Sequence, residues 1–328
     1  MEFIPILVLI HVTNECNLRC KHCYARKGDK RIMKEDFFEL INNLENLGTT
    51  MIHLSGGELL THPEIFEIIR YIKKKDFYLE ITTNGTLLNE EIFKKLKELN
   101  LNKIVISFDG ATPETHDYIR GEGNFKISLE NLDLGLEMGI PMAVNYTVMK
   151  YNYSEIEYAI DFFLKKDLEF LNFRRFIKTG FGKNFDQSIS KEEYLKLFIL
   201  INKVRKEDKR VALGGEPHRI VMDPELREKA LKYGDGGCSA GKYFLSIDPN
   251  GDITPCGFIP IKVGSIYEDN LKDVWENSQI LNKLRDRGNL TGSCKNCLNK
   301  NICGGCRAAA LGTGGDLFGS DPQCWVGC

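Results

Sequence analysis

The chain has 328 residues, with 44 basic and 46 acidic side chains and a formal net charge of -2 at pH 7. This length predicts one large domain plus a smaller one, and the balanced charge gives no electrostatic footprint for a nucleic acid partner. The apolar opening at residues 4–10 is too short to span a bilayer, and it lacks a basic leader or a small-residue cleavage site. It predicts a buried strand in a cytoplasmic protein without a membrane partner.

Up to about residue 176, short β-branched runs alternate with amphipathic helical stretches, a pattern typical of parallel βαβ units. The predicted strands are residues 6–12, 50–54, 78–83, 103–108, 142–148 and 169–176. The predicted helices are residues 34–47, 63–75, 90–99, 124–138 and 154–166. Such a repeat closes into a full or partial barrel, or opens into a doubly wound sheet, and in either case chemistry is expected beyond the C-terminal strand ends.

The rest of the chain changes character twice. Residues 177–237 predict a helical bridge, with helices at 191–206 and 223–233. From residue 238 the periodicity fades, glycine becomes frequent, and eight of the 11 cysteines appear. Cysteines at short spacings without a signal peptide indicate metal ligation rather than disulfides, so this tail is expected to fold around metal. The predicted domains are therefore residues 1–176, 177–237 and 238–328.

Three cysteines lie in the loop that follows the first predicted strand. Cys16, Cys20 and Cys23 form a Cys-x3-Cys-x2-Cys pattern, which suits three irons of a cubane cluster and leaves the fourth iron open. With the aromatic His22 immediately before the third cysteine, residues 16–24 resemble the radical SAM superfamily. The resemblance implies an α/β fold, a partial (β/α)6 barrel of the radical SAM type. It also implies S-adenosylmethionine (SAM) as cofactor and one SAM-binding 4Fe-4S cluster. The alternative is a structural zinc site with His22 as the fourth ligand.

Further segments similar to this family follow successive strands, namely Ser55-Gly56-Gly57-Glu58, Thr83-Asn84-Gly85 and Ser107-Phe108-Asp109-Gly110. In the family, glycines of the first segment let the backbone approach SAM; here Leu59 replaces the proline often found next. Taken alone, Asn84-Gly85 and Asp109-Gly110 would be ordinary turns. The resemblance implies that Ser107 and Asp109 contact ribose, while no catalytic base is assigned. The cofactor-binding candidates are Tyr24, Gly56, Gly57, Glu58, Asn84, Ser107, Asp109, Asn145 and Arg174. For Arg174, as for Arg175 beside it, an inward and an outward side chain are equally expected.

The C-terminal cysteines resemble the SPASM extension of radical SAM enzymes. The resemblance implies two auxiliary 4Fe-4S clusters, one held by Cys294, Cys297, Cys303 and Cys324, the other by Cys238, Cys256 and Cys306 with Cys328 as candidate fourth ligand. Two residues rather than the usual three separate Cys303 from Cys306, and Cys328 is the last residue, so the completeness of the first auxiliary cluster stays open. Alone, these cysteine pairs would look like a zinc knuckle.

The implied chemistry is that of a radical SAM oxidoreductase or maturase. A low-potential donor, a ferredoxin or flavodoxin, reduces the first cluster, and SAM then yields a 5′-deoxyadenosyl radical that abstracts hydrogen. Oxidative modification of a peptide or protein side chain is the leading hypothesis. Gly257 stands where sulfatase-maturing relatives carry an aspartate, which argues against that particular activity.

Two alternatives remain beside peptide modification. Residues 303–309, 315–316 and 321–324 resemble the tail of haem-pathway enzymes that decarboxylate porphyrin propionates, which makes a tetrapyrrole the alternative substrate. The second alternative is a noncatalytic electron-transfer or zinc-binding protein, against which the Gly56-Gly57-Glu58 segment and the barrel pattern argue. Fold does not determine substrate, and the sequence leaves the substrate and the oligomeric state undecided.

Overall fold

A single curved sheet organises the chain in the computed structural model, which describes residues 3–25, 27–233 and 236–326. The strand order is β10-β9-β8-β1-β2-β3-β4-β5-β6-β7, and neighbours from β8 to β7 are parallel, whereas β8, β9 and β10 are antiparallel. The strands are β1 (Leu7–His11), β2 (Met51–Ser55), β3 (Tyr78–Thr83), β4 (Lys103–Phe108), β5 (Met142–Val148), β6 (Phe170–Arg175), β7 (Val211–Leu213), β8 (Phe244–Ile247), β9 (Asp252–Thr254) and β10 (Gly264–Ser265).

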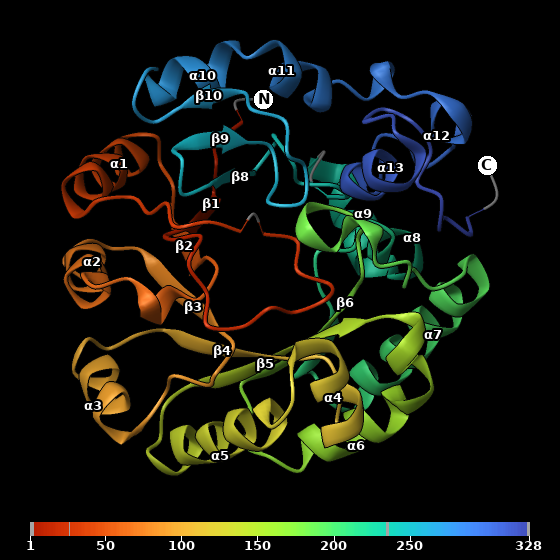
Figure 1. Cartoon of the computed structure of the whole chain (residues 1–328). Coiled ribbons are helices and arrows are strands. Elements are labelled where there is room, and N and C mark those ends of the chain that lie inside the picture. The colour runs from red at the N-terminus through yellow and green to blue at the C-terminus, as the bar shows by residue number, and fades with distance from the viewer. Residues whose placement is uncertain (1–2, 26, 234–235, 327–328) are drawn as a thin grey trace.

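Helices cover the outer face of this sheet (Figure 1). They are α1 (Lys34–Asn46), α2 (Ile65–Lys73), α3 (Glu90–Glu98), α4 (Pro113–Arg120), α5 (Asn124–Glu137), α6 (Ile156–Leu164), α7 (Lys191–Glu207), α8 (Arg219–Met222), α9 (Pro224–Tyr233), α10 (Leu271–Asn277), α11 (Gln279–Arg285), α12 (Gly292–Asn296) and α13 (Arg307–Gly314). Short 3-10 helices occur at Leu59–Thr61, Lys150–Glu155, Gly180–Asn184 and Arg287–Asn289. Local signals fix several starts; Ser190 and Glu193, for example, form a capping box before α7. Among the described helices, none has the length and apolarity needed to cross a membrane.

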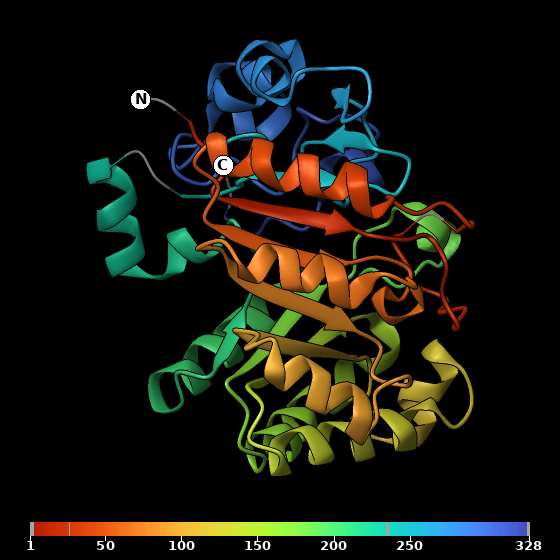
Figure 2. The same ribbon diagram turned by 90° about the vertical axis from the view of Figure 1, so that its left-hand side faces the viewer.

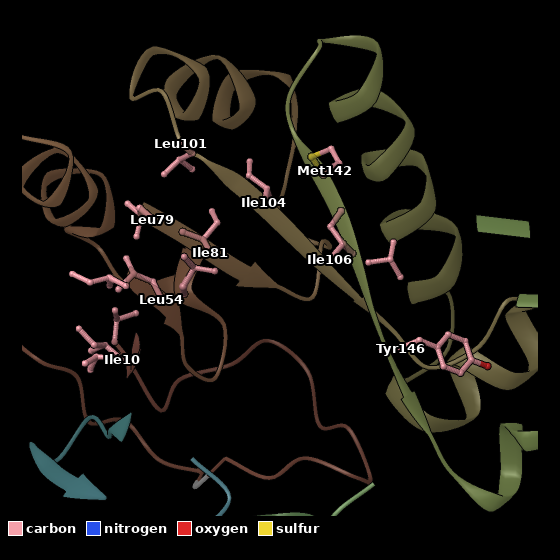
Figure 3. Packing of buried hydrophobic residues seen from close by; sticks show 14 of the residues in the cluster. Ile10, Leu54, Leu79, Ile81, Leu101, Ile104, Ile106, Met142 and Tyr146 are labelled. Carbon is pink, nitrogen blue, oxygen red and sulfur yellow. The ribbon is translucent and has the colours of Figure 1, made fainter. Parts of the chain in front are cut away.

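The two faces of the sheet have different chemistry because successive side chains of a strand point to opposite faces. Outward residues such as Ile10, Ile81 and Ile106 are fully buried against the helices (Figure 3). Inward residues are mixed, and those around the inner cavity include the polar His53, Glu80, Lys103, Asn145 and Arg174 beside apolar residues such as Leu7, Val105 and Phe170. The apolar core therefore lies between sheet and helices, while the inside of the barrel offers polar groups to a ligand.

The predicted partial barrel of alternating strands and helices is confirmed, and all six predicted strands are present. The sheet also continues past them. β7 comes from the predicted bridge and pairs with β6, and β8 comes from the cysteine-rich tail and pairs with β1. The bridge is thus not purely helical, and one sheet crosses the expected boundaries at residues 176 and 237. Helix α4 was not predicted, because eight residues contain too little periodicity to reveal a helix.

The C-terminal segment from α10 onward packs beside β8, β9 and β10, on the side of β1 away from β2 (Figure 2). In the same view the strands β1 to β4 point toward one edge of the sheet, and the chain that leaves β1 lies at that edge. The three N-terminal cysteines are therefore at the C-terminal strand ends, where a barrel of this kind carries its chemistry.

Candidate functional site

The cysteine loop, residues 12–33, joins β1 to α1 and brings three thiols together. Cys20 is buried, and Cys16 and Cys23 are half-buried. Burial raises the pKa of Cys20 to about 11, and the neighbouring Cys23 and Cys16 thiols push it in the same direction, against the opposing effect of Arg120. The pKa of Cys16 is also raised by burial, with Glu58 and Cys23 adding to it. The three sulfurs thus lie within electrostatic range of one another on a single loop.

Gly56 and Gly57 lie directly against this loop. A Cβ at Gly57 would come within 2.1 Å of the Glu15 carbonyl oxygen, and one at Gly56 within 2.7 Å of the Thr13 carbonyl oxygen. The Gly57 N–H donates to the Thr13 oxygen at 2.6 Å. The structure therefore gives these glycines a reason that the sequence did not suggest: side chains are excluded by the backbone of the cysteine loop itself.

Glu58 and Asn84 connect neighbouring strand ends. The buried Glu58 carboxylate accepts hydrogen bonds from the Thr83 hydroxyl at 2.7 Å and the Asn84 N–H at 2.8 Å. Burial raises the pKa of Glu58, although these hydrogen bonds oppose the change. The Asn84 side-chain amide donates to the Asn17 amide oxygen in the cysteine loop at 2.9 Å. Both residues hold the loop against the ends of β2 and β3.

Asp109 was expected to contact ribose, but the structure gives its carboxylate other partners. Arg120 Nε lies 2.5 Å from Asp109 Oδ2, His22 Nε2 lies 3.2 Å from the same oxygen, and the Thr147 N–H donates to Oδ1 at 3.3 Å. Burial raises the pKa of Asp109, but Arg120 and His22 outweigh it and lower the value to about 2. Since the Asp109 side chain is fully buried, it anchors the cysteine loop through His22 and presents no surface to a ribose.

Arg120, at the end of α4, is the functional residue that sequence reasoning missed. Its guanidinium is buried, pairs with Asp109 and lies in electrostatic range of Cys20 and Cys23. A cation beside these thiols favours their ionised, metal-binding form. A lone arginine at a helix end has no sequence signature; the only available signal was that a buried Asp109 would need a counter-charge.

Tyr24 joins the cysteine loop to the chain between β9 and β10. Its ring lies 4.3 Å from the Phe258 ring, centroid to centroid, and burial raises its pKa to about 12. On the other side, a Cβ at Gly180 would come within 1.8 Å of the Tyr24 carbonyl oxygen, and the Gly182 N–H donates to the Cys23 oxygen at 2.7 Å. The segment after β6 therefore packs against the backbone of the cysteine loop at Cys23 and Tyr24.

Ser107, Asn145 and Arg174 line the inside of the barrel. Ser107 on β4 is paired in register with Asn145 on β5, and the Asn145 amide oxygen accepts a hydrogen bond from Asn172 at 2.7 Å. Arg174 points inward, as the lining of the inner cavity shows, whereas Arg175 points outward and is fully buried. Among the residues expected to contact SAM, these three and Tyr24 are not committed to contacts between strand ends.

The C-terminal cysteines fall into two electrostatic groups. Burial raises the pKa of Cys303 to about 12, with Cys324 and Cys294 as the neighbouring thiols. Burial likewise raises the pKa of Cys256 to about 12 and that of Cys306, and Cys238 adds to both. Cys294, Cys297, Cys303 and Cys324 line one cavity, so the members expected for one auxiliary cluster lie near one another. Of the cysteines expected for the other cluster, Cys328 lies outside the described residues.

The donor set fits iron–sulfur clusters. Three thiols on one loop suit a cubane whose fourth iron is open, and each C-terminal group offers further thiolates to an auxiliary cluster. Burial and the nearby Cys238 thiol raise the pKa values of Cys256 and Cys306, so their thiolates are unfavourable without a partner. Binding to a metal would stabilise these thiolates. A curved parallel sheet with a three-cysteine loop at its C-terminal edge defines an iron–sulfur enzyme of the SAM-cleaving class.

Comparisons with known proteins agree with this class. The Radical SAM superfamily model matches residues 10–163, and the SPASM model, an iron–sulfur cluster-binding domain, matches residues 238–298. The chain is 32% identical to an AdoMet-dependent heme synthase of Methanosarcina barkeri, over 98% of this chain and 96% of that protein. It is 27% identical to the mycofactocin maturase MftC of Mycobacterium tuberculosis, over 98% and 83%. The chain belongs to the radical SAM superfamily and carries a C-terminal SPASM domain.

Solved structures share the fold. SuiB of Streptococcus suis bound to its precursor peptide SuiA matches with a TM-score of 0.80 and 19% identity, over 99% of this chain and 76% of that one. The structure of anSMEcpe with bound AdoMet matches with a TM-score of 0.76 and 20% identity, over 98% and 94%. The family matches and the curated relatives make the protein an iron–sulfur radical SAM enzyme with SAM and 4Fe-4S clusters as cofactors, and the noncatalytic alternative is set aside.

Proposed function

We propose that this enzyme oxidatively decarboxylates porphyrin propionates. The observation that carries the proposal is the match to a heme synthase along nearly the full length of both chains at 32% identity. The mycofactocin maturase matches at 27% and over a smaller share of its own length. The proposal places the haem-pathway reaction first, and peptide modification, the leading hypothesis from the sequence, is the second candidate.

The tail residues that resemble haem-pathway enzymes are built into the fold. Arg307 is fully buried, donates to the carbonyl oxygens of Leu317 and Gly319, and lies 3.7 Å from Cys294 Sγ. Asp321 pairs with Arg175 of β6 and accepts the Cys306 N–H at 2.9 Å. These side chains fix the proposed auxiliary ligands relative to a barrel strand. The residues that resemble haem-pathway enzymes therefore include ones that hold the tail in place.

The proposed cluster ligands keep their roles in this reaction. Cys16, Cys20 and Cys23 would hold the SAM-binding cluster, and an external ferredoxin or flavodoxin would supply its electron. When bound there, SAM supplies a radical able to remove hydrogen from an unactivated carbon. The barrel's own contribution is to align the propionate arm and keep water from it.

The overall change at the substrate balances in atoms and charge. A propionate arm loses one hydrogen atom from the carbon next to the ring, and its carbon–carbon bond to the carboxylate then breaks. The products are a vinyl group, CO2 and one electron. One SAM would be consumed for each vinyl group, and an auxiliary cluster held by the C-terminal cysteines would accept the released electron.

The test uses the reconstituted enzyme with SAM, dithionite and an iron porphyrin that bears four propionates. Formation of vinyl products, with one 5′-deoxyadenosine and one CO2 for each, is the expected result. Enzyme that cleaves SAM yet leaves the porphyrin unchanged, under conditions where it modifies a candidate precursor peptide, would establish the second candidate instead. Peptide modification is favoured by the likeness to the mycofactocin maturase.

A further inference from the structure

The inside of the barrel contains an unbalanced cation. A cavity of about 210 Å³ is lined by His53, Glu80, Lys103 and Arg174, together with the amides of Asn145 and Asn172. Lys103 Nζ lies 3.8 Å from Glu80 Oε2, and Arg174 lies in electrostatic range of the same carboxylate, so one anion faces two cations. Burial, with Arg174 and Lys103 nearby, lowers the pKa of His53 to about 3, and its imidazole is neutral at pH 7. The remaining positive charge belongs to Arg174.

Arg174 has no hydrogen-bonded anion among the described residues; the Glu80 and Glu216 carboxylates act on it only through space. Its Nε is buried and makes no hydrogen bond within the described ranges of the chain, whereas the guanidinium of its neighbour Arg175 donates to Asp321 and Gln323. A buried N–H group without an acceptor is unfavourable, and an entering carboxylate would relieve this through two parallel hydrogen bonds. The N–H group without an acceptor therefore points to an anionic ligand.

The position of Arg174 suits a substrate. It lies in electrostatic range of Tyr24 in the cysteine loop, of His53 inside the barrel and of Cys256 in the C-terminal segment. A group held by Arg174 would lie inside the barrel, within electrostatic range of the cysteine loop and of Cys256. At roughly 30 Å³ per water, the cavity takes several waters' worth of ligand, which fits one side arm and excludes a whole macrocycle.

We propose that Arg174, assisted by Lys103, binds a carboxylate arm of the substrate inside the barrel. The inference rests on the proposed function for the identity of that arm, a porphyrin propionate, and assigns Arg174 to substrate rather than to SAM. The anchored arm is distinct from the one that reacts, because its carboxylate is held in an ion pair. The macrocycle then lies outside the cavity, toward the C-terminal strand ends.

The experiment is an optical titration of the cluster-loaded enzyme, without reductant, with the four-propionate iron porphyrin and with its tetramethyl ester. Wild-type enzyme should bind the acid at least ~10-fold more tightly than the ester. Arg174→Gln should abolish most of that preference, and Arg174→Lys should keep part of it because it retains the charge without the planar fork. The matched control is Arg70→Gln, which removes the same charge from an exposed position on α2 and should behave as wild type.

SAM affinity and iron content are measured in the same variants, and both should stay within about twofold of wild type for an intact fold. Loss of SAM binding in Arg174→Gln, or an acid preference that survives in both Arg174 variants, would overturn the inference. Wild-type enzyme that shows the Arg174-dependent preference but forms no vinyl product would overturn the proposed function and leave the carboxylate site standing. Vinyl formation by wild-type enzyme that shows no preference for the acid would overturn the carboxylate site and leave the proposed function standing.

Discussion

At the scale of single residues, the three thiols of the cysteine loop should be individually indispensable. Cys20→Ala removes one ligand from a cubane that has only three, so 5′-deoxyadenosine formation should fall to background and iron content should drop by about four per chain. Cys303→Ala is the comparison, since it belongs to a separate group of cysteines. It should still cleave SAM without coupling to substrate. Retained SAM cleavage in Cys20→Ala would refute the ligand assignment.

The ion pair between Asp109 and Arg120 is the second residue-scale feature. Asp109→Asn leaves a buried guanidinium without its anion, and the free energy of unfolding should fall by about 3–5 kcal/mol. Glu90→Gln removes an exposed partner of Lys94 and should change it by no more than about 1 kcal/mol. Urea denaturation of both variants measures the difference, and equal losses would show that Asp109 does not anchor the loop.

At the scale of elements, close backbone packing makes the turn after β2 intolerant of side chains. Gly57→Ala places a methyl group against the Glu15 carbonyl and must separate this turn from the cysteine loop. We expect reduced iron retention and reduced SAM cleavage. Gly314→Ala, where a Cβ meets nothing within 4 Å, should be neutral or stabilise α13 by up to about 1 kcal/mol. Iron content after desalting checks both variants.

The ion pair that joins β6 to the tail should show strong energetic coupling between its two residues. Arg175 and Asp321 are both fully buried and pair at 2.7 Å, and Arg175 Nε also lies 3.2 Å from Glu216 Oε2, so each single change unbalances a buried group of charges. Arg175→Met and Asp321→Leu should each lower stability by about 3–5 kcal/mol, while the double variant should lose much less than the sum. A double-mutant cycle by thermal or chemical unfolding measures the coupling, and additive losses would argue against the pair.

At the scale of the whole molecule, the apolar core is concentrated in the barrel, and the tail has smaller clusters that include cysteines. Removing iron should therefore loosen the tail far more than the barrel, because metal binding supplies part of its folding free energy. Hydrogen exchange of metal-free and reconstituted protein should differ mainly within residues 238–326. Reconstituted protein should hold about twelve irons per chain if both auxiliary clusters form, and about eight if one does. Uniform loss of protection across both regions would contradict this.

The sequence predicted those features that repeat or have fixed spacing. Six parallel strands follow a regular βα pattern, and the cysteine triad has a defined spacing, so both were predicted correctly as patterns. The three-residue β7 and four-residue β8 carry too little pattern to be read as strands. Contacts such as Asp109 with Arg120, 11 residues apart, or Arg175 with Asp321, 146 residues apart, follow no repeated spacing and leave no pattern in the sequence. They decide what Asp109 does, which is why its role could not be predicted.

The position of β1 bears on how the protein is made. This first strand is an interior strand, flanked by β2 on one side and by β8, from beyond residue 240, on the other. At about 5–20 residues per second, synthesis leaves one side of β1 open for some tens of seconds. During that time its unpaired edge can join another chain, and the cysteine loop that follows it lacks its contact with Phe258. The sheet beside the cysteine loop is thus completed only late in translation, and a chain that ends before β8 would carry the three N-terminal cysteines on an incomplete sheet.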